Sequence, residues 1–341
     1  MVQNLITMSK KETSRLGVIS QLIDGKMNGT EAAKQLRLSV RQVKRLKSRV
    51  AREGVEGLIH KNRGRPSSRR VPEIIIGKVR EYLREHYQDF KPKFASEKLR
   101  ERHKIMLSAE KVRQIMIEEK IWKVHSRKKN GEHREWRERK EHVGEMEQFD
   151  GSYHDWFEGR GEKCCLLGSI DDADGGVRLK FDRDEGVRAV YGFWKEYVEE
   201  KWKPMIIYVD KYSTYKVNQK SLLNENEAQT QFGRAMKELD VRVIYAHSPQ
   251  AKGRIERLFE TLQDRLVKEL RLNNISGIEA ANKFLEERYT QGFNEQFRVA
   301  PRQQRNLHRA LSKEEKKDFE RIFSIQNTRV VNNDFTVRYQ G

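Results

Sequence analysis

The chain has 341 residues, of which 36% are hydrophobic, and it carries a formal net charge of +19 at pH 7. This length predicts two or three domains with packed cores. No stretch approaches the roughly 18 consecutive apolar residues of a membrane-spanning helix, and the first residues lack the apolar core of a secretory signal, so we expect a cytoplasmic protein without a membrane partner. The two cysteines, Cys164 and Cys165, are neighbours, which excludes a disulfide framework and a multi-cysteine metal cage.

The charge is segregated along the chain. Residues 1–140 contain 37 Lys and Arg against 17 Asp and Glu, a net charge of +20, whereas residues 141–240 contain 14 against 21, a net charge of −7. A cationic front joined to an acidic middle predicts a module that binds a polyanion, attached to a domain that needs carboxylates. The alternative, in which the basic charge only keeps the protein in solution, stays open at this point.

The motif GTEAAKQLRLSVRQVKRLKSRVAR at residues 29–52 predicts two short helices around a tight turn. Thr30 is placed to cap the first helix, and Ser39 with Gln42 forms a capping box for the second. The buried stripe at helical spacing consists of Leu36, Val43, Leu46 and Val50. This is the pattern of a helix-turn-helix domain, assigned to residues 1–62, whose second helix enters the major groove of DNA. The residues expected to contact DNA are Ser39, Arg41, Lys44, Arg45 and Lys47.

Residues 63–71 are predicted to form a basic linker. The surrounding stretch HKNRGRPSSRR contains five Lys and Arg, Pro and Gly breakers and almost nothing apolar, so it cannot pack into a core. Its RGRP centre is similar to arms of the AT-hook type, in which an extended backbone inserts arginines into a narrow minor groove. Arg63 and Arg65 are therefore further candidates for DNA contact.

Residues 72–122 predict a second helix-turn-helix-like domain, with one amphipathic helix followed by two more. Ser108 is placed to cap the last of these helices. The expected core positions are Ala95, Leu99, Val112, Ile115 and Met116. The exposed face mixes both signs of charge, so a DNA-binding role and a purely structural role both stay open. Residues 123–143 are too charged to form a domain and predict a charged linker.

From residue 144 the pattern changes to five short strands, the first three in succession and the later ones alternating with helices. This order predicts a mixed α/β sheet covered by helices, assigned to residues 144–298. The first strand is expected to end near Asp150 and the fourth at Asp210, while a long helix begins near Gly253 and carries Glu256. Such carboxylates can hold two Mg²⁺ ions roughly 4 Å apart for phosphodiester chemistry. The chain has 51 acidic residues, so spacing alone does not single out these three.

Five stretches of this region resemble a known family: QFDGSYHDWFEGRG, SIDDADGG, YVDKYSTYKVN, SPQAKGRIERLFETLQDRLVKELRL and FNEQFRVAP. They are similar to the integrase-core DDE transposases of bacterial insertion sequences, most closely the ISNCY group. With the front helix-turn-helix, the resemblance covers nearly the whole chain. It implies an α/β ribonuclease H-like core with a mixed five-stranded sheet of order 3-2-1-4-5 and helices on both faces. It also implies that Asp150, Asp210 and Glu256 are the catalytic metal ligands.

The sequence departs from that family at two places. Tyr212 follows the second aspartate where relatives have a histidine, and Asp174 with Gly175 follows IDDA where relatives have Thr-Ser. None of these is a predicted ligand. Asp171 and Asp172 are expected to open the DADGG turn as hydrogen-bond acceptors rather than to bind metal.

Basic residues flank the acidic positions, and each is expected either to contact the DNA backbone or to be a solvated surface residue. The candidates for DNA contact here are Lys211, Lys252 and Arg254. On the helix that begins near Gly253, a buried apolar stripe leaves Glu256, Glu260 and Asp264 on one flank. At about 1.5 Å per residue the last two run away from the sheet, so only Glu256 is expected in the site.

Residues 299–341 predict a basic connector and an incomplete, truncated C-terminal β region. Phe335, Val337 and Tyr339 alternate as in a strand, and a single strand with unpaired edges is poorly stabilised.

The resemblance implies a nucleoid-associated DNA transposase that binds the terminal inverted repeats of an insertion sequence and integrates into target DNA. Its partners would be double-stranded DNA and further copies of itself, with no small-molecule cofactor. Two Mg²⁺ ions, for which Mn²⁺ can substitute, would serve strand cleavage and strand transfer. Two alternatives remain: a DNA-binding repressor that does not cut, and a nuclease of the same fold that cleaves RNA in hybrids.

Overall fold

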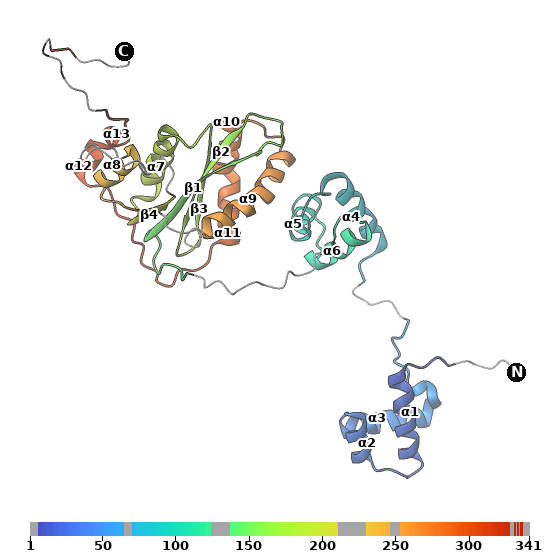
Figure 1. Cartoon of the computed structure of the whole chain (residues 1–341). Helices are drawn as coiled ribbons and strands as arrows, with labels where there is room; N and C mark the ends of the chain where they lie inside the picture. The colour runs from blue at the N-terminus through green and yellow to red at the C-terminus, as the bar shows by residue number, and fades with distance from the viewer. Residues whose placement is uncertain are drawn as a thin grey trace. The chain divides into compact units, whose positions relative to one another are not determined.

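A computed structural model describes residues 6–64, 70–123, 137–210, 230–245 and 253–327, together with 331, 333, 335 and 336. The chain divides into two compact units, Met1–Trp122 and Lys123–Gly341 (Figure 1), and each is described by itself. Among the described residues, no helix is both long and apolar enough to cross a membrane.

The first unit begins with a three-helix domain. Its helices are α1 (Lys10–Ile23), α2 (Gly29–Leu36) and α3 (Val40–Glu53), followed by the 3-10 helix η1 (Gly54–Leu58). The helices α2 and α3 are the predicted pair, and Arg37 turns the chain between them with a left-handed φ of 51°. The helix α1 is an addition that the motif alone does not predict.

Side-chain caps set where these helices begin. Ser39 and Gln42 form the predicted capping box of α3, with the Gln42 N–H donating to Ser39 Oγ at 3.2 Å. At α2 the prediction is wrong, because the cap is Asn28, whose Oδ1 accepts from the backbone N–H groups of Thr30 and Glu31. The asparagine oxygen satisfies two of the N–H groups that a helix start leaves unpaired, and Thr30 lies inside the helix.

The predicted apolar stripe forms the core of this domain. Val43 is fully buried, and the partly buried Leu36, Leu46 and Val50 pack against the same cluster. Helix α1 contributes Ile19, which is also fully buried. This packing leaves the basic face of α3 on the surface.

A second helical group follows in the same unit, formed by α4 (Glu73–His86), α5 (Pro92–His103) and α6 (Ala109–Glu118). Ser108 caps α6 as predicted. The predicted core residues are all fully buried: Ala95, Leu99, Val112, Ile115 and Met116. Several exposed arginines of this group form ion pairs with nearby glutamates, as Arg113 does with Glu110. Its binding to DNA stays a prediction.

The second unit is built on a five-stranded mixed sheet with the order β3-β2-β1-β4-β5. The strands are β1 (Met146–His154), β2 (Cys164–Asp171), β3 (Val177–Asp182), β4 (Ile206–Val209) and β5 (Arg242–Tyr245). The pairs β1–β2 and β2–β3 are antiparallel, while β1–β4 and β4–β5 are parallel. The predicted ribonuclease H-like fold and its strand order are confirmed.

The first strand is longer than the sequence suggests, and the expectation that it ends near Asp150 is wrong. Strand β2 supplies partners for the additional residues, from Gly151 opposite Leu167 to His154 opposite Cys164. These residues lack a pattern of alternating apolar side chains, so their strand conformation depends on pairing with β2. Asp150 therefore lies in the middle of a strand that is anchored on both sides.

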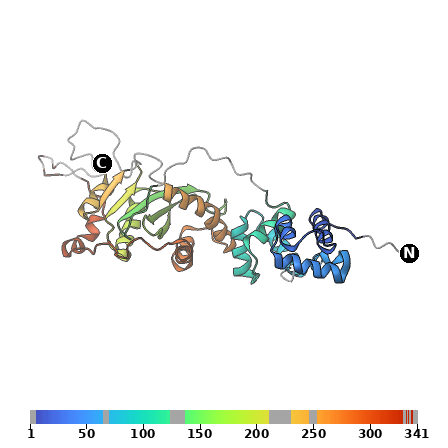
Figure 2. The same cartoon turned by 90° about the horizontal axis from the view of Figure 1, so that it is seen from below.

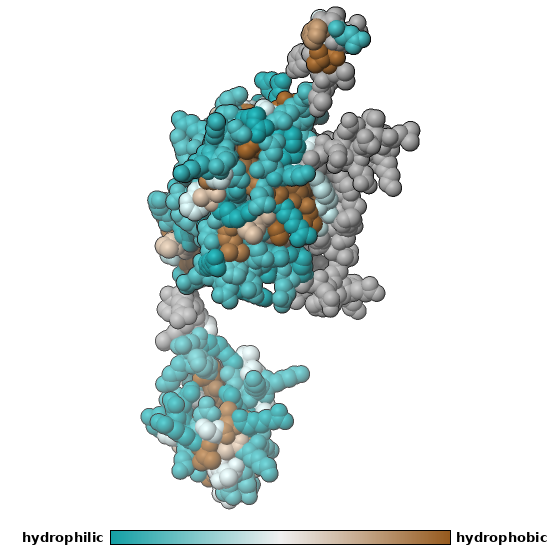
Figure 3. Space-filling model, turned by 90° about the vertical axis from the view of Figure 1, so that its left-hand side faces the viewer, coloured by the Kyte–Doolittle hydropathy of each residue, from teal (hydrophilic) through white to brown (hydrophobic). Residues whose placement is uncertain are grey.

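Helices cover both faces of the sheet, as Figures 1 and 2 show. One face packs on α7 (Val187–Lys201) and α8 (Gln231–Glu238). The other packs on α9 (Gly253–Leu272), α10 (Ile278–Phe284), the π-helical turn η3 (Leu285–Tyr289) and α11 (Thr290–Phe297). The surface of this unit in Figure 3 is mostly hydrophilic, with small apolar patches.

The segment after α11 packs against the core of the second unit, which differs from the expected connector. It contributes two short helices, α12 (Lys313–Lys317) and α13 (Phe319–Ile322). Phe319 and Ile322 are buried in the same cluster as α7 and α8, and the backbone of Arg309 pairs with that of Lys203. Most of the predicted terminal β region lies outside the described residues.

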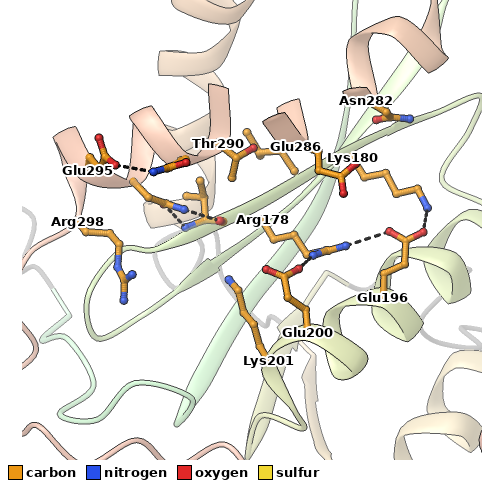
Figure 4. A pocket seen from close by; sticks show the side chains of 14 residues that line it. Arg178, Lys180, Glu196, Glu200, Lys201, Asn282, Glu286, Thr290, Glu295 and Arg298 are labelled. Carbon is orange, nitrogen blue, oxygen red and sulfur yellow. Dashed lines mark hydrogen bonds and ion pairs between the residues drawn. The ribbon is translucent and has the colours of Figure 1, made fainter. Parts of the chain in front are cut away.

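Two asparagines protect the outer edge of β3. Asn282 Oδ1 accepts from the Phe181 N–H at 2.7 Å and its Nδ2 donates to the Phe181 carbonyl at 2.9 Å, and Asn294 makes the same pair of bonds with Val177. Both asparagines line a polar hollow of about 990 Å³ between α7 and α10–α11 (Figure 4). Because edge strands expose unpaired backbone groups, these side chains take the place of a sixth strand.

Replacing Asn282 with alanine is expected to lower the free energy of unfolding of the second unit by about 1–3 kcal/mol, since the backbone donor and acceptor of the buried Phe181 lose their partner. Denaturant unfolding followed by tryptophan fluorescence measures the change. Glu286→Ala, on the rim of the same hollow, is the control and should change stability by less than about 0.5 kcal/mol. Equal stability of the two variants would contradict this role of Asn282.

A buried polar group lies under β1, on the face opposite Asp150. Glu147 is 2% exposed, and the Tyr197 hydroxyl hydrogen-bonds to its Oε1 at 2.8 Å and to His308 Nε2 at 2.8 Å. Burial, with the nearby Asp171 carboxylate, raises the pKa of Glu147 to about 8. Burial also lowers the pKa of His308 to about 4, so both side chains are neutral at pH 7 in the folded protein.

Glu147 should lower stability as the pH rises from about 4.5 to 8, whereas the lowered pKa of His308 raises stability up to about pH 6.5, so the net fall is expected above about pH 6.5. In that range the folded protein keeps a proton on Glu147 that the unfolded chain has released, so raising the pH favours unfolding. Glu147→Gln is expected to flatten this dependence and to be more stable than the wild type at pH 8, by on the order of 1–3 kcal/mol. Thermal or denaturant unfolding between pH 5 and 8 measures this pH dependence of stability. The control is Glu199→Gln, because Glu199 is exposed. An unchanged slope in Glu147→Gln would show that another group is responsible.

Candidate active site

Alternate residues of β1 face helix α9. Gln148 Oε1 accepts from the Ile255 N–H at 3.3 Å, and the Gln263 side chain donates to Ser152 Oγ at 3.2 Å. Successive residues of a strand point to opposite faces of the sheet, so Asp150, midway between Gln148 and Ser152, faces α9 as well. Its side chain is half-buried.

Asp210 follows the strand that neighbours β1. Strand β4 pairs in parallel with β1, and Tyr208 is opposite Gln148. Continuing this register by two residues places Asp210 opposite Asp150, where neighbouring strands are about 4.8 Å apart. Asp210 directly follows Val209, the last residue of β4, and is exposed. The register therefore predicts that the two aspartates are neighbours at the step where β4 ends and β1 continues.

Glu256 is in the first turn of α9, and its side chain is exposed. One turn further along α9, Phe259 packs on Gly168, where an added Cβ would lie 3.3 Å from the ring. Gly168 is the residue opposite Asp150 on β2. The glycine therefore lets α9 approach β2 at the position next to Asp150.

The donor atoms of this site are carboxylate oxygens, which suit Mg²⁺ or Mn²⁺ better than zinc. Within the described ranges, no three His, Cys, Asp or Glu side chains are close enough together to hold one ion. The strand register sets Asp150 and Asp210 at similar levels, and the first turn of α9 is tied to β1 through Gln148, but the three carboxylates do not form a closed cage. The chemistry of the donors fits a divalent ion.

Other site candidates border regions that the structure does not describe. Residues 211–229 follow Asp210 and residues 246–252 precede α9, and both ranges lie outside the described residues. They contain Lys211, Tyr212 and Lys252, whose roles stay predictions.

Asp171 and Asp174 hold the turn between β2 and β3. Asp171 accepts from the backbone N–H groups of Ala173 at 2.8 Å and Gly144 at 2.7 Å, and burial raises its pKa. Asp174 accepts from the Gly176 N–H and forms an ion pair with Arg298. The expectation that Asp171 is a turn acceptor is confirmed.

Asp172 makes a different set of contacts. Its side chain is fully buried and accepts from Gln148 Nε2 at 2.7 Å and from Arg254 Nε at 2.8 Å. Arg254 therefore has a carboxylate partner within the protein, and its contact with DNA stays a prediction. Neither Gln148 nor this role of Asp172 was among the sequence candidates, although Gln148 shares the period-two face of Asp150.

The helix-turn-helix candidates fall into two groups. Arg41, Lys44 and Arg45 are exposed and line a shallow hollow along α3, and none has an acidic partner among the residues that the structure describes. By contrast, Ser39 is used as the cap, and Lys47 Nζ donates to the Leu22 carbonyl at 3.2 Å. Lys47 is also exposed, but its ammonium group is used by that carbonyl, so only the first group is charged, exposed and not engaged within the part of the domain that the structure describes.

The predicted minor-groove arm begins next to α1. Arg63 forms an ion pair with Glu12 and donates to the Thr7 carbonyl at 2.9 Å. Hydrogen bonds from the Ser9 N–H and from Arg63 lower the pKa of Glu12 to about 2. Arg63 is thus tied to the three-helix domain, while Arg65 lies outside the described residues.

Comparisons with solved structures give low similarity. A simian T-cell lymphotropic virus intasome in complex with the PP2A regulatory subunit B56 gamma is 15% identical and covers 54% of this chain and 62% of its own, with a TM-score of 0.35. The trimeric HTLV-2 integrase catalytic core domain with magnesium is 16% identical, and the match covers 42% of this chain and 82% of that domain, with a TM-score of 0.31. At these scores the likeness adds nothing to the fold that the strand order defines.

Comparisons of sequence are more informative. A family model described as a helix-turn-helix domain matches residues 14–67. The Sinorhizobium fredii protein y4bF, which is named as a transposase, is 41% identical over 309 residues, covering 90% of this chain and 67% of the relative. The transposase for insertion sequence IS1202 of Streptococcus pneumoniae is 32% identical over 323 residues, covering 84% of this chain and 68% of the relative. The chain therefore belongs to the transposases of bacterial insertion sequences.

Proposed function

We propose that this transposase is a DDE-type polynucleotidyl transferase, which cleaves and joins DNA strands at the ends of its insertion sequence. The observation that carries the proposal is the parallel pairing of β1 with β4, whose register, continued past the last printed pair of Gln148 with Tyr208, would set Asp210 level with Asp150. Asp150 and Asp210 would hold a divalent ion, and Glu256 would complete the site. When bound, Mg²⁺ ions supply polarisation of the attacking oxygen and stabilisation of the leaving oxygen at phosphorus.

The protein side chains then position and bind rather than react. Asp150 comes from the sheet, Asp210 directly follows a paired strand of it, and Glu256 comes from a helix packed on that sheet. Neither cysteine is suited to act as a nucleophile, because burial raises the pKa of Cys164 to about 11 and raises that of Cys165 further. A water molecule, and then a 3′-hydroxyl of the DNA, would be the successive nucleophiles.

The basic stripe of α3 supports binding of double-stranded DNA at the terminal inverted repeats. Its exposed residues Arg41, Lys44 and Arg45 lie on the second helix of a helix-turn-helix, which is the helix that enters the major groove in such domains. Arrangement of two DNA ends in one complex would require more than one copy of the chain.

The test uses the full chain and a labelled duplex that carries the inverted repeats flanking its gene. Mg²⁺-dependent nicking at the repeat ends, followed by joining of the new 3′-hydroxyl to a second duplex, is expected. A duplex with scrambled ends should not react. Tight, salt-sensitive binding without any cleavage would instead favour a repressor, and preferential cleavage of an RNA strand in a hybrid would favour a nuclease.

A further inference from the structure

The carboxylate of Asp172 is the centre of a buried hydrogen-bond network at the start of α9. Its side chain is fully buried, and Oδ1 accepts from Gln148 Nε2 and Arg254 Nε, while Oδ2 accepts from the Lys140 N–H at 2.9 Å. Arg137 also forms an ion pair with it. A buried carboxylate with this many donors is fully satisfied, so its surroundings are held in one arrangement.

One link runs from Asp172 through Gln148 to α9. An ionised carboxylate only accepts hydrogen bonds, so it orients the Gln148 side chain with Nε2 towards Asp172. Oε1 then faces the other way and accepts from the Ile255 N–H at 3.3 Å. That N–H belongs to the first turn of α9, where backbone N–H groups have no partner within the helix.

A second link runs from Asp172 through Arg254. Arg254 Nε donates to Asp172 at 2.8 Å, and Nη2 donates to the Arg137 carbonyl at 2.9 Å. The Arg254 side chain is only 13% exposed, so the guanidinium is held between β2 and the segment that precedes β1. Residues 254 and 255 are thus both tied to one carboxylate, and the next residue is Glu256.

We propose that Asp172 is a positioning residue, which sets the place of Glu256 relative to Asp150 by anchoring the first turn of α9 through Gln148 and Arg254. Asp172 itself does not contact metal or DNA in this role. The inference rests on the proposed function of Glu256 as a ligand. Since the exposed Glu256 side chain has little packing to hold it, its reach towards Asp150 depends on where the backbone of α9 begins.

The neighbouring Asp171 offers a matched control. It is also buried, at 4% exposure, and accepts backbone hydrogen bonds, but its partners are Ala173 in the turn and Gly144 just before β1, and neither lies on α9. Asp171→Asn should therefore destabilise the fold without moving α9. Asp172→Asn removes the negative charge that holds Arg254 and puts an amide N–H group opposite the Lys140 N–H, so it should weaken both links and have both effects.

The first measurement is hydrogen exchange of the full chain without metal or DNA. In Asp172→Asn, the peptide that contains the first turn of α9 is expected to exchange about tenfold faster or more than in the wild type, and in Asp171→Asn it should not. Arg254→Gln, which removes one link and leaves the carboxylate in place, should give a smaller acceleration. The Arg254→Gln variant also allows the anchoring of α9 to be tested if Asp172→Asn does not fold.

The second measurement is the Mg²⁺ concentration that gives half-maximal strand cleavage. Residues that orient a ligand typically change metal affinity by about 10–100-fold when they are replaced, so Asp172→Asn should raise this concentration by about that factor, and Asp171→Asn should leave it unchanged. In the background of Glu256→Gln, adding Asp172→Asn should cause no further loss.

Equal exchange rates and equal Mg²⁺ dependence in Asp171→Asn and Asp172→Asn would overturn the proposal. Full activity of Glu256→Gln would instead overturn the proposed function. In that case the exchange experiment would still report whether Asp172 anchors α9, so the two failures are distinguishable.

Discussion

Replacing Asp150 with asparagine or Glu256 with glutamine is expected to reduce Mg²⁺-dependent strand cleavage by about a thousandfold or more. Loss of a carboxylate ligand removes several kcal/mol of transition-state stabilisation, and about 4 kcal/mol corresponds to a thousandfold in rate. Asp210→Asn should have the same effect, because Asp210 continues the register that places it opposite Asp150. The measurement is single-turnover cleavage of a duplex that carries the inverted repeats.

Matched controls are available for both substitutions. Glu260→Gln is the control for Glu256, because Glu260 is exposed and lies one turn later on α9. Asp155→Asn is the control for Asp150, because Asp155 follows on the same segment and its carboxylate accepts from the Gly159 N–H. Both controls should cleave within a fewfold of the wild-type rate. All variants should retain thermal stability and DNA affinity. Cleavage at the wild-type rate by Asp150→Asn would rule out this site.

Removing the exposed basic residues of α3 is expected to weaken binding to the inverted repeats by on the order of a hundredfold at about 0.15 M salt. The variant replaces Arg41, Lys44 and Arg45 with alanine, and each lost phosphate contact contributes about 1 kcal/mol. The slope of log affinity against log salt should also become shallower by about 0.9 for each contact. Titration of labelled duplex at several salt concentrations measures both quantities.

The control for this variant removes the same charge from other helices of the same domain. Lys10, Lys11 and Lys34 are exposed on α1 and α2, and their replacement by alanine should lower affinity much less. An equal loss in the two triple variants would mean that the effect is a general one of net charge. In that case α3 would not be the helix that contacts DNA.

Local patterns predicted much of the chain because they report interactions between residues close in sequence. The capping box joins Ser39 and Gln42, which are three positions apart, and its atoms meet as soon as the helix forms. The apolar stripe of α9 is equally local: Ile255, Leu258, Phe259, Leu262, Leu266 and Leu270 are all buried as predicted. Glu260 on its flank is exposed, whereas Asp264 is held in an ion pair with Lys268 at 2.5 Å.

The resemblance to insertion-sequence transposases added the topology, which local patterns cannot supply. Strand order is a property of pairing between segments: β1 pairs with β4, about 60 residues away in sequence, and not with β3. Short strands predict a sheet but not its order. The family supplied that order, and with it the expectation that Asp150 and Asp210 are neighbours.

The sequence by itself thus determined the helix pair of the motif, the caps of α3 and α6, the apolar stripes and the carboxylates worth testing, because each depends on residues within a few positions of one another. The tertiary structure alone decided how far β1 extends, where the tail packs and what holds α9. Strand β1 reaches His154 only because β2 pairs with it, and Arg254 meets Asp172 across 82 residues of chain. Such contacts form when the chain closes on itself, and no local pattern encodes the partner.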